Sequence, residues 1–202
     1  MCIRDRLLVV GKQYDHMVND HPGYNPENLA YVYIGAVDST GRAKLIEETQ
    51  RLPEVDAITT CYNLPFWGAS GNNVYLPGDD RELFNIADLY DVGNDYLNVL
   101  EIPIVEGQYF TENTTSSQEI LVSRNFIEYM KPFADWKDGA VGKTVQITGH
   151  DTKSESMPLF TIRGVFEDFR LGSIAGEDPR AKIMFYTCLL YTSPSPRDLS
   201  TS

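Results

Sequence analysis

The segment 140–144, AVGKT, contains the lysine-threonine pair of phosphate-binding loops. Such a loop also needs a glycine five residues before Gly142, and a helix after the threonine whose N-terminus faces the phosphates. Position 137 is Lys137, and the residues that follow, TVQIT, alternate apolar and polar side chains as a strand does. We therefore expect no nucleotide binding around Lys143.

Histidine and carboxylate side chains gather in the loop 149–157, where His150, Asp151 and Glu155 could be imagined as metal ligands. They lack the i, i+4 helical spacing and the paired cysteines that make a metal site specific. His16 and His21 flank the sequence MVND, which follows the apolar stretch LLVVG. That stretch could be the last turn of a membrane helix, so we expect the two histidines to be polar residues near the membrane surface and not ligands. No metal site and no cofactor site is assigned.

Two pairs of neighbouring carboxylates, Asp79/Asp80 and Glu167/Asp168, could in principle supply a general acid and base. The sequence identifies neither a nucleophile nor a partner that would tune their pKa values. Cys61, in AITTCYNL, is interpreted as a small buried hydrophobic residue. No catalytic residue is assigned.

Two motifs could mark surface sites. Asn113 opens an Asn-Thr-Thr sequon, which matters only on a glycosylating secretory route. Phe66 and Trp67, in a stretch rich in turn formers, could form a stacking platform for a sugar or a peptide, although core packing or a contact between lobes is the favoured interpretation.

The first third of the chain has the pattern of a β-α-β unit. Residues 29–36 and 54–62 are β-branched and aromatic, as in strands. Residues 43–52 between them have helical spacing of apolar side chains and end at Pro53. A parallel strand pair crossed right-handedly by the helix is the expected geometry.

The rest of the chain predicts mostly strands. A short helix is expected at 94–100 with Asn94 as N-cap, and an amphipathic helix at 124–133. Residues 142–148 and 158–169 alternate as an antiparallel pair would. Further strands are predicted at 73–76, 83–93, 119–123 and 181–187. The predicted fold class is α+β, a β-α-β lobe with a strand-rich second lobe.

Composition excludes some partners. The formal net charge is −12, with 29 acidic and 17 basic residues and no long run of either sign. A nucleic-acid surface needs clustered Lys and Arg, so we expect no nucleic acid partner.

Both ends differ in character from the rest. Residues 1–6 and 188–202 resemble translated sequencing-adapter sequence, so we expect them to be artefacts and the gene product to extend beyond both. A genuine disordered tail rich in Ser, Pro and Thr is the alternative.

The order of several stretches resembles the MacB-like periplasmic core domain of FtsX-like ABC-transporter permeases. These stretches are GYNPENLAYVYI, RLPEVDAIT, NDYLNVLEIPIVEGQYF, EILVSRNFIEYM, VGKTVQI and FTIRGVFEDFR. Ser123 with Arg124 departs from the family, which usually has an asparagine opening that helix. The residues that carry the motifs, all expected to be structural, are Tyr96, Leu100, Ile102, Gly107, Phe110, Gly142, Gly164, Val165, Asp168 and Phe169. Glycine within the strand patterns, at Gly107 and Gly164, is typical of a bulge or a close backbone approach.

The resemblance implies a domain arrangement. Residues 7–11, LLVVG, would be the end of a truncated first transmembrane helix, and 12–187 a periplasmic core domain incomplete at its C-terminus. We therefore expect the last strand, with Ile183, Met184 and Phe185, to lack cover.

The resemblance also implies a function. It implies a permease domain at the inner membrane, on its periplasmic side, which couples helix movement to periplasmic partners or substrate in export or lipoprotein handling. ATP would be hydrolysed by a separate or fused ATPase, so this chain is expected not to be an enzyme. The implied partners are that ATPase, a second copy or sister permease, and a periplasmic adaptor. The alternative is a secreted carbohydrate- or peptide-binding module.

Overall fold

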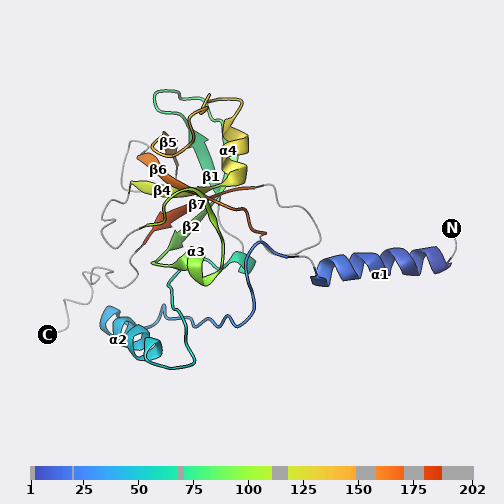
Figure 1. The fold of residues 1–202 in the computed structure, drawn as a ribbon. Helices are drawn as coiled ribbons and strands as arrows, with labels where there is room; N and C mark the ends of the chain where they lie inside the picture. Colours follow the sequence, from blue (N-terminus) through green and yellow to red (C-terminus); the bar gives the residue numbers. More distant parts are fainter. Residues whose placement is uncertain are drawn as a thin grey trace.

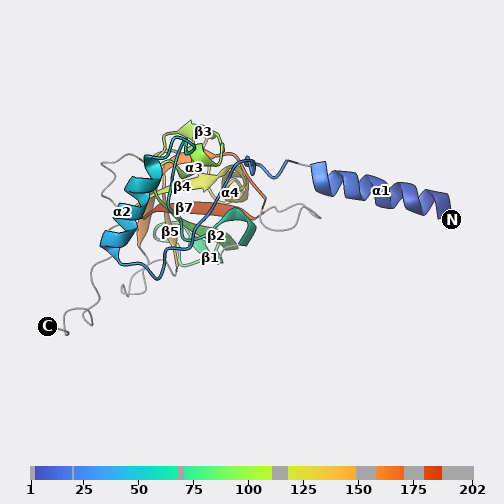
Figure 2. The same cartoon turned by 90° about the horizontal axis from the view of Figure 1, so that it is seen from below.

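The computed structural model describes residues 3–19, 21–67, 71–110, 118–148, 158–170 and 180–187. Helix α1, Ile3–Asn19, projects away from the body of the molecule in both views (Figures 1 and 2). Its apolar residues Leu7, Leu8, Val9 and Val10 are exposed. None of the helices in the described ranges has both the length and the apolar character needed to span a bilayer.

Helix α2, Ser39–Gln50, begins where the sequence provides a cap. The Asp38 side chain accepts a hydrogen bond from the Gly41 amide at 2.9 Å, which satisfies one of the donors that a helix start leaves open. Arg51 pairs with Glu47 and Glu48 at the other end. No residue of α2 is buried, so the helix forms without packing against a core.

The two strands predicted to flank α2 are absent. Residues 29–36 and 54–62 have no strand, and their one ladder contact is an isolated bridge between Cys61 and Val92. Tyr31, Val32 and Tyr33 are exposed, because no described strand lies beside them. Their composition suits a pleated, half-buried surface, but a strand forms only where a neighbour completes its hydrogen bonds.

The body of the molecule is a closed sheet. Its strands follow the order β3-β6-β4-β7-β2-β1-β5, and β5 pairs with β6 as well, so six of them close into a barrel with β3 beside β6. The bounds are β1 Gly71–Tyr75, β2 Phe84–Val92, β3 Ile104–Gly107, β4 Glu119–Ser123, β5 Thr144–Ile147, β6 Leu159–Phe166 and β7 Ala181–Tyr186.

Most strand predictions outside the first third are confirmed, including the antiparallel pairing of β5 with β6. Helix α4, Arg124–Met130, follows β4 directly and ends near the predicted stop. It lies on the connection between β4 and its parallel partner β6. One connection between parallel strands therefore lies here, and the expected one around α2 is absent from the described residues.

Two apolar clusters lie on opposite faces of the strands. The interior cluster collects side chains from β1, β4, β5, β6 and β7 and is covered by Phe126 and Met130 of α4. The outer cluster lies under helix α3, Tyr96–Val99, and includes Tyr90, Phe166 and Phe169. Together they bury both faces of β7.

The expectation that the last strand lacks cover is wrong. β7 is central, between β4 and β2, and Ile183, Met184 and Phe185 are all buried. Apart from those of α1, many of the exposed apolar side chains lie in the segment that contains α2. They are Leu29, Tyr31, Val32, Tyr33, Leu45, Leu52, Tyr62 and Trp67.

The start of α3 also differs from the prediction. Its N-cap is Asp95, in the left-handed region at φ 61°, and not Asn94. The Tyr109 hydroxyl holds this turn, because it accepts from the Tyr96 amide at 3.2 Å and donates to the Gly93 carbonyl at 2.8 Å. A tertiary contact takes over part of the role of the cap.

Candidate functional site

A row of polar side chains crosses the outer face of three adjacent strands. Asp88 on β2 lies opposite Lys182 on β7 in the parallel register. Ser123 at the end of β4 comes next, and its hydroxyl accepts a hydrogen bond from the Lys182 amide at 3.1 Å. All three side chains are buried. The strand pairing thus gathers residues that lie far apart in sequence.

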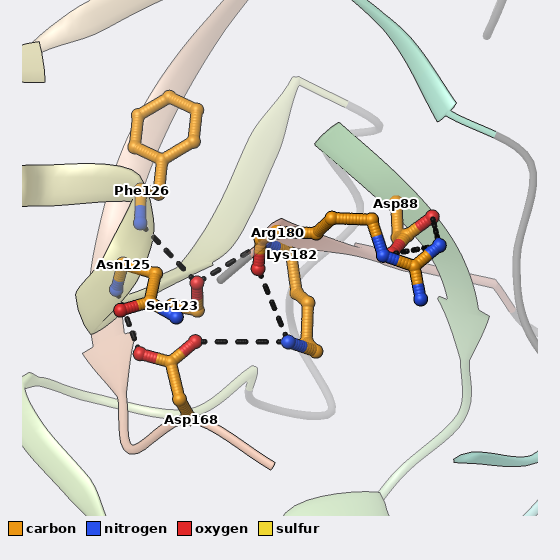
Figure 3. Close-up of polar contacts among 7 residues, drawn as sticks. All are labelled: Asp88, Ser123, Asn125, Phe126, Asp168, Arg180 and Lys182. Carbon is orange, nitrogen blue, oxygen red and sulfur yellow. Dashed lines mark hydrogen bonds and ion pairs between the residues drawn. The ribbon is translucent and has the colours of Figure 1, made fainter. Parts of the chain in front are cut away.

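Lys182 is fully buried, and its ammonium lies close to the Arg180 carbonyl and the Asp168 carboxylate (Figure 3). Nζ donates to the Arg180 carbonyl at 3.1 Å and lies 3.8 Å from Asp168 Oδ1. It also lies 5.4 Å from the centre of the Phe169 ring, within reach of a cation–π interaction. A buried charge is tolerated only with such partners.

Asp168 follows β6 and links three elements. Its Oδ2 accepts from the Asn125 amide in α4 at 2.7 Å, while its Oδ1 faces Lys182 on β7. Burial raises the pKa of Asp168 above its usual value, although the Asn125 amide, the Lys182 charge and the Ser123 hydroxyl oppose that rise. The carboxylate is therefore less favourable here than in water, and its contacts fix position more than they add net stability.

Asp88, the other charged residue of the row, pairs with Arg180. Arg180 lies 3.4 Å from Asp88 Oδ2 (Figure 3). Ser123 also caps α4, accepting from the Phe126 amide at 3.3 Å. The departure from the family's asparagine therefore keeps a working cap, which Asp168 supplements at Asn125.

A serine, a lysine and an aspartate in one place suggest nucleophilic chemistry, but the geometry does not support it. Ser123 and Lys182 are both completely buried, so no substrate reaches the hydroxyl. The serine oxygen already accepts two amide hydrogens. The row is a structural element that joins β2, β7, β4, α4 and the segment after β6.

The connection from α1 to the body docks beside this row. The Pro22 carbonyl accepts from the Arg170 amide at 2.7 Å, and the Asn25 amide donates to the Leu100 carbonyl at 2.9 Å. The Asn25 side chain adds a bond to Glu101 at 3.0 Å. Arg170, two residues after Asp168, therefore binds the segment that follows α1.

Gly23 makes this docking possible. It has φ +86°, and a Cβ built on it would lie 2.6 Å from both the Asp168 carbonyl oxygen and the Phe169 Cα. Only glycine allows both that conformation and that approach. Tyr24 then packs edge-on against the Phe169 ring, with the ring centres 6.4 Å apart.

The motif residues lie in or around the two apolar clusters. Tyr96, Leu100, Ile102, Phe110 and Phe169 belong to the outer cluster, whereas Val165 belongs to the interior one.

The glycines of the motifs lie at close backbone contacts or turns. Gly107 and Gly164 face each other in the register of β3 and β6, next to a register shift. A Cβ on Gly107 would lie 2.3 Å from the Arg163 carbonyl, and one on Gly164 would lie 2.8 Å from the Gln108 carbonyl. Gly142, at φ +81°, turns the chain into β5 with open space around it.

The other candidate chemical residues are not brought together. The loop with His150, Asp151 and Glu155, and the sequon Asn113, lie outside the described residues. His21 accepts from the Gly23 amide, at 3.0 Å. In the part of the chain that the structure describes, no three His, Cys, Asp or Glu side chains group as metal ligands. The residues after Lys143 form β5, as predicted.

The acidic pairs and the aromatic pair also have local explanations. Asp79 pairs with Arg81, and Glu167 with Arg124. Trp67 is 58 % exposed and packs edge-on against Tyr31. It thus contacts another segment but does not enter a core.

Sequence reasoning missed Gly23, Asp88 and Lys182 as members of a site. A signal for two of them was present, because Lys182 and Asp88 are charged residues inside the largely apolar strands AKIMFY and FNIADLYDV. A charge in such a strand must find a partner. The partner's identity depends on strand order, which the sequence does not reveal.

Comparison with known proteins gives one family. The family model for the MacB-like periplasmic core domain matches residues 7–194. No curated protein matches.

Solved structures with some likeness come from several bacteria. The periplasmic region of MacB from Actinobacillus actinomycetemcomitans is 17 % identical with a TM-score of 0.45, over 71 % of this chain and 54 % of that one. The extracellular domain of the noncanonic ABC-type transporter YknZ from Gram-positive bacteria is 12 % identical with a TM-score of 0.45, over 85 % and 67 %. A domain of a putative permease protein from Porphyromonas gingivalis is 18 % identical with a TM-score of 0.40, over 76 % and 69 %.

This chain spans about half the length of the MacB periplasmic region. The assignment rests on the family model, which covers most of the sequence and includes every motif residue named above. The chain belongs to the family of the MacB-like periplasmic core domain.

Proposed function

We propose that this chain is the extracytoplasmic domain of an ABC-transporter permease subunit, in which it couples movement of a membrane helix to periplasmic partners or substrate. Residues 7–11 would be the outer end of that helix, and the permease would lie in the inner membrane. Export or lipoprotein handling would be the process served. The single observation that carries the proposal is the docked connection between α1 and the body.

The connection is short, and hydrogen bonds attach it both to the segment after β6 and to the residues after α3. Asn19 ends α1, and by Pro22 the backbone is already bonded to Arg170. Asn25 then bonds to Leu100 and Glu101 beside α3. A Gly/Ser-rich linker would absorb a displacement of the helix, whereas a connection pinned at several points passes it to the sheet.

The proposal places ATP hydrolysis in a separate or fused nucleotide-binding domain. The polar groups of the candidate site are buried or paired with one another, which suits a structural role for that site. A second copy or a sister permease, and a periplasmic adaptor, are the further partners proposed.

A secreted carbohydrate- or peptide-binding module is the second candidate. The exposed Trp67 with its edge-on neighbour Tyr31 is the observation in its favour, since aromatic side chains present large faces to ligands. A module of this kind would not need the α1 connection to be rigid.

A linker insertion tests the coupling. Four residues, Gly-Ser-Gly-Ser, are inserted after His21 in the complete permease, and export is followed as rescue of a strain that lacks the gene. We expect rescue to fall at least about ten-fold, because a flexible linker no longer passes the displacement on. The matched control is the same insertion after Gly78, in an exposed turn where nothing lies within 4 Å of a built Cβ. It should retain rescue, and full rescue by both variants would refute the coupling.

A further inference from the structure

The segment after β6 forms the surface on which the α1 connection lies. Residues 168–170 present the Asp168 carbonyl and the Phe169 Cα to Gly23, and the Arg170 amide to Pro22. β6 itself ends at Phe166, so strand pairing no longer fixes these residues. We call residues 168–170 the seat of the α1 connection.

Side chains hold the seat in place of a strand neighbour. The Phe169 ring is buried against Tyr90 and Phe166, with ring centres 5.5 and 6.1 Å away. This packing positions the Phe169 ring, but ring contacts have no fixed direction and restrain the neighbouring backbone less than hydrogen bonds do. The Asp168 side chain adds a directional hydrogen bond from the Asn125 amide, together with polar contacts to Ser123 and Lys182.

We propose that the ion pair between the buried Lys182 and the partly buried Asp168 is a latch that fixes the seat, and through it the docking of residues 22–25 on the barrel. Lys182 belongs to β7, which pairs with β4 and β2 and is buried from Ala181 to Phe185, so the pair ties the seat to a deeply packed strand of the barrel. Without the carboxylate charge, the buried ammonium loses its ion pair, although the Arg180 carbonyl and the Phe169 ring still lie beside it. Without the ammonium, the carboxylate loses its ion pair with β7 and keeps the hydrogen bond from the Asn125 amide of α4.

The proposal deepens the proposed function, on which its biological meaning rests, because a latch on the seat sets how firmly the helix exit is held. The raised pKa of Asp168 fits this role. Burial disfavours the charged form of this carboxylate, so we expect the ion pair to fix the position of the seat more than it raises the stability of the fold. Replacing both members of a buried ion pair by neutral side chains often leaves a fold as stable as before.

The test compares amide hydrogen exchange in four variants of the full chain, without nucleotide or ATPase. They are Asp168→Asn, Lys182→Met, the double variant, and Glu167→Gln as matched control. Glu167 is the neighbouring carboxylate, but it pairs with Arg124 at a more exposed position. The readouts are the amides of Asn25 and Arg170, which bond across the connection, against the amides of β4 and β7.

We expect Asp168→Asn and Lys182→Met each to speed exchange at Asn25 and Arg170 at least about ten-fold relative to β4 and β7. The double variant should keep this local effect while its melting temperature returns toward that of the wild type, since no charge is then left unpaired. Glu167→Gln should change neither the exchange at Asn25 and Arg170 nor the melting temperature. The latch is refuted if exchange at Asn25 and Arg170 rises only in step with the barrel, or if the double variant restores slow exchange there. Because the linker insertion tests coupling separately, failure of one experiment leaves the other interpretable.

Discussion

Replacing Gly107 by alanine should lower the free energy of unfolding by about 3 kcal/mol, as expected where a special backbone conformation and a close contact coincide. Gly107 has φ +76°, and its new Cβ would meet the Arg163 carbonyl oxygen and the Gly164 Cα, at 2.3 and 2.8 Å. Both are backbone atoms of β6, so relief requires the two strands to separate. Urea denaturation of the variant measures the loss.

Gly142→Ala is the matched control for this variant. Gly142 has a similar φ, +81°, but nothing lies within 4 Å of a built Cβ. It should cost only the conformational term, about 1 kcal/mol. Equal losses in the two variants would show that the close approach of β3 and β6 contributes nothing to the effect.

Phe126→Ala should cost about 3–5 kcal/mol, the range for removing a buried aromatic ring. Phe126 is fully buried, joins α4 to the interior cluster, and meets the Phe84 ring edge-on at 5.5 Å. The vacated volume lies between a helix and a closed sheet, which limits collapse around it. Thermal or urea unfolding gives the value.

The neighbouring ring on the same helix provides the comparison. Tyr129 also contacts Phe84, with ring centres 5.4 Å apart, but it is 40 % exposed. Tyr129→Ala should cost about 1 kcal/mol or less, as for partly exposed side chains. A loss for Tyr129 that matches the loss for Phe126 would mean that burial inside the barrel is not what stabilises α4.

The sequence predicted the elements whose signals are local. The alternation in β5 and β6 and the spacing in α4 each identified an element close to its observed bounds. Residues 29–36 carry an equally strong strand composition, yet they form none, because a strand also requires a neighbour that the local pattern does not specify. The same composition therefore gave a correct prediction in 181–187 and a wrong one in 29–36.

The candidate site depended on contacts between distant residues. Gly23 approaches Asp168, and Lys182 approaches the same residue from another strand. The stretches that contain Gly23 and Asp168 both carry the family resemblance, but neither sequence predicts that the two residues are in contact. Only the strand order and the path of the chain after β6 bring them together.

The side of the membrane on which the barrel lies is the most direct test of the account. Asp80, exposed in the loop between β1 and β2, is replaced by cysteine in the complete permease. Intact cells with a permeabilised outer membrane are then treated with a membrane-impermeant maleimide. The parent without this change gives the background. Cys61 should add little, because burial raises the pKa of its thiol to about 11 and few thiolates are present at neutral pH. We predict strong labelling of Asp80→Cys before lysis, on protein that stays with the membranes after an alkaline wash. Labelling only after the inner membrane is broken, or labelled protein released in soluble form, would contradict a membrane-anchored extracytoplasmic domain.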